Sequence, residues 1–235
     1  MSSKKELRLQ RKGTIINKTS KRQESELNQA ITSVIQCLEK NFPKIKLTHS
    51  KHWLLIDIIS SLQKSFPNIE FHTCNASSSM KPDGGILSLL ANNGKHYPIL
   101  IAEKKNQGTN DLRANEGKKK QAKGNAIERL GKNVIGFRTA LLEESIFPFV
   151  CFGDGCDFSE DSSILDRVVT IAMFGKLNTE YLHNQNNETF NRGTFYFREK
   201  HWTEAEMRDH CYSIAKKSIY YYFSKYGEST FYNDV

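Results

Sequence analysis

The sequence predicts an α/β or α+β fold, because helical and extended patterns alternate along its 235 residues. Apolar residues recur at helical spacing over residues 27–38, whereas compact apolar runs around Leu100 and Val150 are typical of buried strands. An Asn-Gly pair between the runs around Leu89 and Leu100 indicates a β-hairpin. A chain of this length can bury one substantial core.

Composition and charge favour a soluble globular protein. With 38% hydrophobic and 26% charged residues, the chain is expected to be neither disordered nor membrane-bound. It has no apolar stretch typical of a membrane span or a secretory signal, and its five cysteines form no CxxC pair, which favours reduced thiols in the cytoplasm. The formal net charge of +8 favours a polyanionic partner, foremost nucleic acid, although many basic proteins bind none.

Residues 1–23 are predicted to form a mobile basic arm, followed by a single folded domain over residues 24–235. The arm holds eight Lys or Arg residues and one acid, Glu6, with almost no apolar periodicity. It is either a solvated tail or a segment that lies along DNA phosphates, and the residues leave both interpretations open.

The first half of the domain is predicted to contain two helices and a hairpin. The helices are expected over residues 24–41 and 52–66, with Pro67 ending the second. Residues 69–74 are predicted as a short strand. Strands over residues 84–91 and 97–104 form the hairpin, because Asn and Gly in the connecting turn both tolerate positive φ.

The second half is predicted to be helical around one buried strand. A polar loop is expected over residues 106–116, and a helix begins near Asn125. The run "FPFVCFG", residues 147–153, is predicted as a buried strand, and residues 202–227 as a closing helix that packs its apolar side chains inward.

The hairpin is expected to gather three charged side chains. Side chains alternate faces along a strand, so Tyr97, Ile99, Ile101, Glu103 and Lys105 are predicted to share one face. Lys104 faces the other side and is expected to be replaceable without loss of chemistry. The partner strand begins directly after Asp83, so the hairpin returns Glu103 close to Asp83.

Two carboxylates beside one ammonium are suited to phosphodiester hydrolysis. Asp83 and Glu103 offer the oxygen ligands that Mg²⁺ prefers, and the metal neutralises charge on the phosphate and acidifies a bound water. Lys105 can hold the attacking water and stabilise the transition state. Taken singly, however, Asp83 is also an ordinary turn residue, and the charged pair an ordinary strand end.

Three strings in order, "SSSMKPDGG", "IAEKKNQG" and "GNAIERLGKN", resemble the EcoRI group of type II restriction endonucleases, within the PD-(D/E)xK nuclease superfamily. The resemblance covers roughly residues 75–226. It implies a restriction-endonuclease-like core with a mixed central β-sheet flanked by helices. It also implies that Asp83 and Glu103 form the acidic pair, that Lys105 is the catalytic lysine, and that Lys104 offers its backbone carbonyl to the metal.

The resemblance places base recognition at the start of the helix near residue 125. Asn125, Glu128 and Arg129 would share one helix face, and Asn and Arg side chains suit purine edges. Without the resemblance, a solvated, salt-bridged helix start is the default interpretation. Lys81, Ser79 and Gln107 flank the reaction centre and are candidates for phosphate contacts, and Arg167 resembles an arginine that helps the family to read its site. The full recognition segment is Ala122, Gly124, Asn125, Ala126, Glu128 and Arg129.

The sequence therefore predicts a Mg²⁺-dependent, sequence-specific deoxyribonuclease that acts on double-stranded DNA as a homodimer. The resemblance implies the site GAATTC or a variant with an AATT core, cut with 5′ overhangs in a bacterial or archaeal cytoplasm. It also implies a companion DNA adenine methyltransferase for the same site. Two alternatives remain: a repair or recombination nuclease of the same fold with relaxed specificity, and a non-catalytic basic DNA-binding module.

Overall fold

The computed structural model describes residues 15–72, 75–108, 110–119, 125–184 and 191–232. The side chains of residues 15–20, 106–108, 125 and 126 lie outside this description. None of the described helices is both long and apolar enough to cross a membrane.

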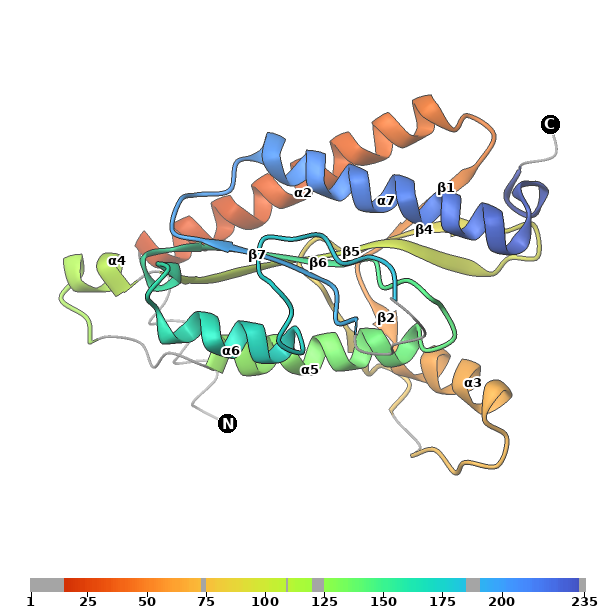
Figure 1. The fold of residues 1–235 in the computed structure, drawn as a ribbon, viewed down its shortest axis with the longest axis horizontal. Helices are drawn as coiled ribbons and strands as arrows, with labels where there is room; N and C mark the ends of the chain where they lie inside the picture. Colours follow the sequence, from red (N-terminus) through yellow and green to blue (C-terminus); the bar gives the residue numbers. More distant parts are fainter. Residues whose placement is uncertain (1–14, 73–74, 109, 120–124, 185–190, 233–235) are drawn as a thin grey trace.

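A five-stranded sheet lies between two layers of helices (Figure 1). Helices α2 and α7 cover one face, and α5 and α6 cover the other, while α3 projects from one end. The strands in sheet order are β1 (Lys46–Ser50), β4 (Ile86–Leu90), β5 (His96–Gly108), β6 (Phe149–Gly155) and β7 (Thr194–Arg198). The helices are α2 (Ile15–Asn41), α3 (Leu55–Ser65), α4 (Asn110–Asn115), α5 (Asn125–Ala140), α6 (Ser163–Ile171) and α7 (Glu204–Tyr226).

The sheet is mixed, and β5 is the strand at which its character changes. β1, β4 and β5 pair antiparallel, whereas β5, β6 and β7 pair parallel. The connection from β5 to its parallel neighbour β6 runs through α4 and α5, and the connection from β6 to β7 runs through α6. A small second sheet joins β2 (Trp53–Leu54) to β3 (Ser79–Met80). The predicted mixed sheet flanked by helices is thus confirmed.

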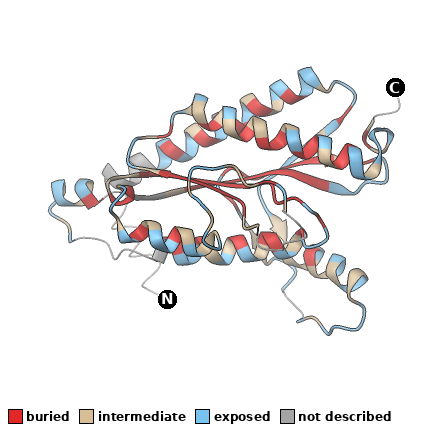
Figure 2. Cartoon of the chain, in the orientation of Figure 1, coloured by how far each residue is buried: buried red, intermediate tan, exposed pale blue. Residues whose placement is uncertain are grey.

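The two faces of the sheet bury separate apolar clusters, because each helical layer turns one apolar stripe inward. The α2 and α7 layer packs against residues such as Leu100 and Phe152, and the α5 and α6 layer against Ile101 and Phe149. Figure 2 shows that buried residues follow the sheet and the inward sides of these helices, whereas α3 is mostly exposed or intermediate.

The hairpin between β4 and β5 forms as predicted, and its glycine adopts the left-handed conformation that the turn needs. Gly94 has φ 79°, and its N–H donates to the Ala91 carbonyl at 2.9 Å. The Ala91 N–H in turn donates to Lys95 O, which closes the turn at 2.9 Å. Asn93, by contrast, does not have a positive φ.

A β-bulge changes which side chains of β5 share a face. Leu87 pairs with Leu100 but Ser88 pairs with Pro98, so one residue of β5 is unmatched between them. Tyr97 therefore packs on the α7 side with Leu100, whereas Ile101 packs on the α5 side. The prediction that Tyr97, Ile99 and Ile101 share a face is wrong, but the alternation holds from Leu100 onward.

Three predicted boundaries also need correction. Helix α2 begins at Ile15, so residues 15–23, predicted as part of the arm, are helical; the Lys, Arg and Gln residues there are good helix formers. Residues 69–72 are not a strand. The predicted loop over 106–116 contains the end of β5 and helix α4. Residues 1–14 of the predicted arm lie outside the described part.

Candidate active site

A tight turn lays Asp83 against the end of β5. The Gly85 N–H donates to Pro82 O at 3.1 Å, and the Gly84 N–H donates to Ala102 O at 2.9 Å. A side chain at Gly84 would meet Ala102 Cβ at 2.9 Å, so only glycine allows this approach. The Nε2 nitrogen of His49 donates to Gly84 O at 2.9 Å and holds the turn from the β1 side.

Asp83, Glu103 and Lys105 meet at this turn. The Asp83 N–H donates to Glu103 Oε2 at 3.1 Å, and the Lys104 N–H donates to Asp83 Oδ2 at 3.2 Å. The Lys105 ammonium donates to Glu103 Oε1. The hairpin thus returns Glu103 to Asp83 as the sequence predicts, and Lys105 lies on the same face two residues further on.

Burial and charge work against each other at this cluster. Glu103 is only 2% exposed, and burial raises its pKa above the ordinary value; the nearby charge of Asp83 adds to the rise, while Lys105 opposes it. For Lys105, burial acts to lower the pKa, but the charges of Glu103 and Asp83 and the hydrogen bond to Glu103 outweigh it and raise the pKa. The ammonium is therefore held in its charged form, beside a carboxylate that is costly to ionise.

Other residues complete the surroundings of Glu103. Asn133, on α5, donates to Glu103 Oε1 at 3.4 Å, and the fully buried Cys151 pairs with Glu103 across the parallel β5–β6 ladder. Glu24, on α2, has a pKa raised by burial and by the charge of Asp83. Sequence reasoning missed all three. For Asn133 a signal existed, since it lies one helical turn beyond Arg129 on the same helix.

The donor set at the turn suits a hard divalent cation. Two carboxylates are present, and the Lys104 N–H donates to Asp83. Because the N–H and C=O of one residue in a strand point to the same side, the Lys104 carbonyl is expected to face Asp83 as well. Oxygen donors of this kind fit Mg²⁺, which takes one or two carboxylates and keeps several waters. Within the described ranges, no three His, Cys, Asp or Glu side chains gather into a metal cage.

The side chain of Lys104 lies on the opposite face, as predicted, but it is not free. It is fully buried and its Nζ atom lies 3.2 Å from Asp154 Oδ1. Removal of the Lys104 side chain leaves a buried carboxylate short of its cation, so we expect it to reduce stability. That Lys104 is replaceable without loss of chemistry stays a prediction.

The predicted DNA-contacting residues lie on several elements. Glu128 and Arg129 are exposed on the first turns of α5, and Arg167 is exposed on the neighbouring α6. Lys81 is exposed just before Asp83, and Ser79, in β3, is half-buried. Three further predicted residues have a described backbone but no described side chain: Gln107 in β5, and Asn125 and Ala126 in α5. The last two, Ala122 and Gly124, lie outside the described residues.

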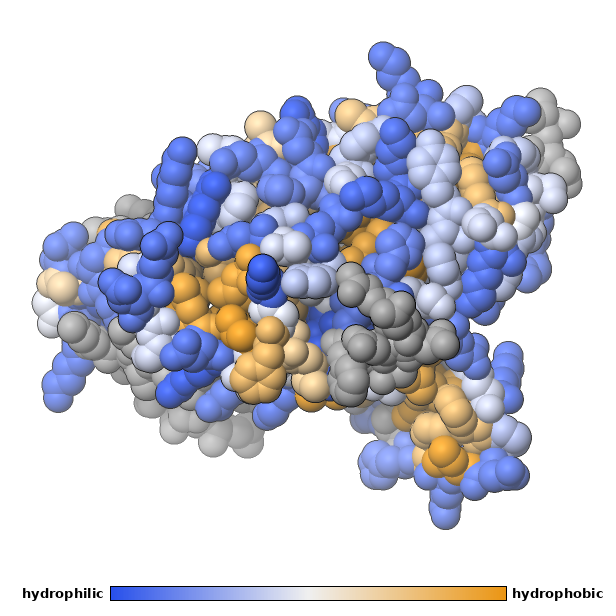
Figure 3. Space-filling view, in the orientation of Figure 1, coloured by the Kyte–Doolittle hydropathy of each residue, from blue (hydrophilic) through white to orange (hydrophobic). Residues whose placement is uncertain are grey.

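The Pro82–Gly85 turn, which carries Asp83, does not line the pocket that lies at the other end of β4 and β5. That pocket, of about 550 Å³, lies between β1, α3 and the end of α5, and Asp83, Glu103 and Lys105 do not line it. In Figure 3 polar residues cover most of the visible face, with apolar residues around α6 and along α3. Asp83 itself is exposed. An exposed turn is accessible to a macromolecular substrate that is too large to enter a pocket.

Comparison with known protein families identifies the family to which this fold belongs. The family model described as "Restriction endonuclease EcoRI" matches residues 10–229. The chain belongs to the EcoRI restriction endonuclease family. The restriction-endonuclease-like fold and the enzyme class predicted from the sequence, a type II site-specific deoxyribonuclease, are thereby confirmed.

Two relatives of this EcoRI-family enzyme give the same picture. The type II restriction enzyme RsrI of Cereibacter sphaeroides is 26% identical over 241 residues, which cover 88% of this chain and 87% of the relative. The type II restriction enzyme EcoRI of Escherichia coli is 30% identical over 142 residues, which cover 57% of this chain and 51% of the relative.

Proposed function

We propose that this enzyme cleaves double-stranded DNA with Mg²⁺ held by Asp83 and Glu103, and with Lys105 as the catalytic lysine. The observation that carries the proposal is the hydrogen-bonded cluster at the Pro82–Gly85 turn, where two carboxylates and one ammonium converge. Type II restriction endonucleases use a divalent metal, and the oxygen donors at this turn favour Mg²⁺.

Each residue of the cluster has a distinct part in the reaction. When bound, the cation supplies charge neutralisation at the phosphate and a more acidic water. Asp83 and Glu103 would hold the cation, and the Lys105 ammonium, which donates to Glu103 Oε1, would orient the attacking water and donate to a phosphate oxygen. The Lys104 carbonyl adds a neutral oxygen donor, so its contribution here comes from the backbone.

We infer that the start of α5 reads the bases. Glu128 and Arg129 are exposed there, and their spacing puts them on the face shared with Asn125. Arg and Asn side chains can bond bidentately to purine edges in the major groove. The proposed site is GAATTC or a palindrome with an AATT core, cut with 5′ overhangs, and Lys81, Ser79, Gln107 and Arg167 contact the flanking DNA.

A two-fold homodimer follows from the same proposal. One cluster per chain can cut one strand, and two-fold symmetry in the protein matches two-fold symmetry in a palindrome. A host of such an enzyme needs an adenine methyltransferase that modifies the same site.

Plasmid digestion tests the proposed function. Purified protein is incubated with plasmid of known sequence, with Mg²⁺ or with a chelator, and the fragment ends are sequenced. We expect discrete fragments with 5′ overhangs at one hexamer, only with Mg²⁺. A smear would instead support a nuclease of relaxed specificity, and intact DNA in every buffer would support a binding module.

The matched control separates the cluster from the rest of the fold. Glu103→Gln keeps the shape of the side chain but removes its charge, so we expect specific DNA binding without cleavage. Cleavage by Glu103→Gln at the wild-type rate would refute the assignment of the cluster.

A further inference from the structure

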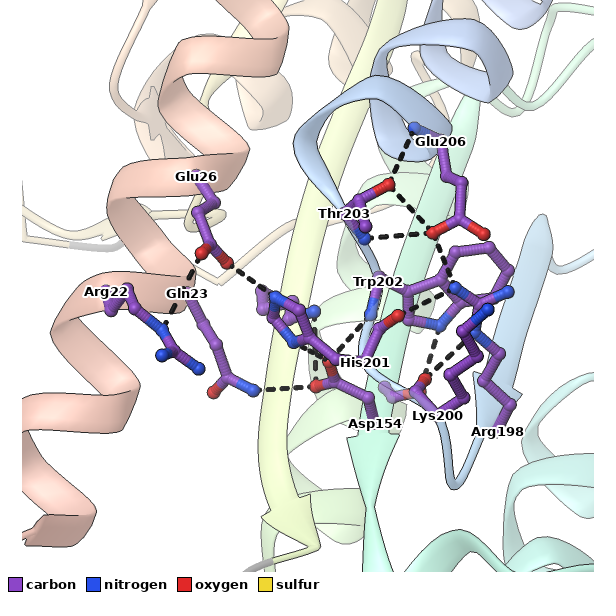
Figure 4. A network of polar contacts seen from close by, with 12 residues as sticks. Arg22, Gln23, Glu26, Asp154, Arg198, Lys200, His201, Trp202, Thr203 and Glu206 are labelled. Carbon is purple, nitrogen blue, oxygen red and sulfur yellow. Dashed lines mark hydrogen bonds and ion pairs between the residues drawn. The ribbon is translucent and has the colours of Figure 1, made fainter.

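A second charged cluster lies beneath the catalytic strand, on the opposite face of the sheet from the proposed active site. Its centre is Asp154, on β6. The Asp154 carboxylate accepts hydrogen bonds from Gln23 Nε2 at 2.8 Å, His201 Nδ1 at 2.6 Å and the Trp202 N–H at 2.9 Å. Figure 4 shows Gln23 reaching it from α2, and His201 and Trp202 from the segment before α7. The fourth partner is the Lys104 ammonium, at 3.2 Å.

This ion pair is as buried as the apolar core around it. The Lys104 side chain is 0% exposed and that of Asp154 is 2% exposed. Burial lowers the pKa of Lys104, and the charge of Asp154 opposes that shift. Well-packed apolar residues in place of a buried ion pair are often equally stable or more stable. Stability alone therefore gives no reason for a charged pair here.

The pair lies where β5 has lost one of its two neighbouring strands. Pairing with β4 ends at Ile86 and Ile101, whereas Glu103, Lys104 and Lys105 still pair in regular register with β6. The segment from Glu103 to Lys105 is therefore held by a strand on one side only, and its pairing with β6 becomes irregular just beyond Lys105.

We propose that Lys104 and Asp154 are positioning residues for the cleavage reaction. This inference rests on the proposed roles of Glu103 and Lys105. Lys104 stands between these two residues, and side chains alternate faces along the strand. The ion pair fixes the Lys104 side chain to β6 on the α2 and α7 side of the sheet, and this fixes the rotation of β5 about its own axis. Glu103 and Lys105 are thereby directed toward the scissile phosphate on the other side. The Lys104 N–H and carbonyl are held toward Asp83.

The decisive variant removes both charges at once. Lys104→Met/Asp154→Leu replaces the ion pair with apolar side chains, so neither charge is left buried alone, and the strand loses its tether. Gln23, His201 and the Trp202 N–H lose their acceptor, so we expect some loss of stability as well. We expect the single-turnover cleavage rate to fall by on the order of 10- to 100-fold, since small displacements of reacting groups have effects of this size. DNA affinity without divalent metal should change by less than about threefold. Asp154→Asn, which is isosteric, should show a smaller loss of rate with the same unchanged affinity.

A matched control is Glu144→Gln. Glu144 is also a buried carboxylate, bound by Tyr221, Lys225 and Tyr226, and lies after α5, away from the turn. It should lose thermal stability but keep the wild-type cleavage rate, with every variant assayed well below its own Tm.

The outcomes separate the two proposals. If Lys104→Met/Asp154→Leu cleaves at the wild-type rate while Glu103→Gln is inactive, the positioning role is overturned and the active site stands. If Glu103→Gln cleaves normally, the active site itself is misassigned. A rate loss in the double variant that is matched by Glu144→Gln would mean general destabilisation and would also overturn the positioning role.

Discussion

Glu103 illustrates the conflict between stability and chemistry within a single side chain. In the role proposed for it, Glu103 must be ionised to hold a cation, yet the fold buries it, and burial raises its pKa. In the metal-free protein its charge is therefore destabilising, and Lys105 only partly offsets this effect. Binding of the proposed cation would reverse the effect, because the cation brings further positive charge to the carboxylate.

A pH prediction follows for the metal-free protein. Because the folded-state pKa of Glu103 lies above its ordinary value of 4.5, the folded state binds more protons than the unfolded state in the interval above pH 4.5. The contribution of Glu103 to stability is thus fully present below pH 4.5 and is lost as pH rises through the raised value. The Tm of Glu103→Gln minus that of wild type should increase from pH 4 to pH 7. A constant difference in thermal unfolding across that range would contradict it.

Sequence reasoning at the residue scale predicted that Asp83, Glu103 and Lys105 meet, but not the residues that support them. Asp83, Glu103 and Lys105 follow from alternation and the hairpin, which are local rules. Asp154 and His201 come from segments far along the chain, and only tertiary packing brings them under Lys104. Local periodicity therefore placed Lys104 on the correct face without revealing what lies there.

At the scale of elements, the Pro82–Gly85 turn decides where Asp83 lies. In Gly84→Ala the new methyl group would meet Ala102 Cβ at 2.9 Å and Leu27 Cδ2 at 3.1 Å, so the turn must move away from β5. We expect a loss of about 1–3 kcal/mol in stability from overpacking and a cleavage rate lowered by roughly 10-fold or more. Chemical denaturation and single-turnover cleavage measure the two effects.

A glycine in a different turn, the one between β4 and β5, provides the control. Gly94 has φ 79°, and a methyl group added at its α-carbon would have no atom within 4 Å, so Gly94→Ala is strained but not crowded. It should lose about 1–2 kcal/mol and cleave at the wild-type rate. Equal rate losses in Gly84→Ala and Gly94→Ala would show that the close contact at Gly84 does not position Asp83.

The positions of helices with a clear apolar periodicity in the sequence were predicted well. Features that depend on contacts between distant segments were not. The start of α5 at Asn125 and the closing helix α7 agree with the sequence patterns. The start of α2 was missed because residues 15–23 carry no apolar stripe, although Gln23 is buried on Asp154. The bulge in β5 was missed because an unmatched residue leaves no mark in an apolar run.

At the scale of the whole molecule, the net charge of +8 governs how the enzyme meets DNA. Each phosphate neutralised by a Lys or Arg contributes about −0.9 to the slope of log affinity against log salt. Lys81, exposed beside the acidic turn, is proposed to make one such contact. Lys81→Ala should therefore reduce the magnitude of the slope by about 1 without altering the cleaved sequence.

Lys217→Ala is the control for this prediction. Lys217 lies on α7, on the other side of the sheet from α5, and pairs with Glu180 at 2.8 Å. Its removal should leave the salt slope unchanged. If fluorescence anisotropy titrations gave the same slope for Lys81→Ala as for wild type, Lys81 would not contact a phosphate.

Helix α5 belongs to the crossover between the parallel strands β5 and β6, and Asn133 on that helix donates to Glu103, which is proposed to hold the metal. Exposed positions at its beginning, such as Glu128 and Arg129, can vary while Asn133, a turn further on, stays in place. Attempts to retarget the enzyme to new sequences should therefore keep the helix at constant length and confine diversity to its first two turns. A library built on inserted or deleted residues there would rotate Asn133 away from the carboxylate and yield binders that no longer cut.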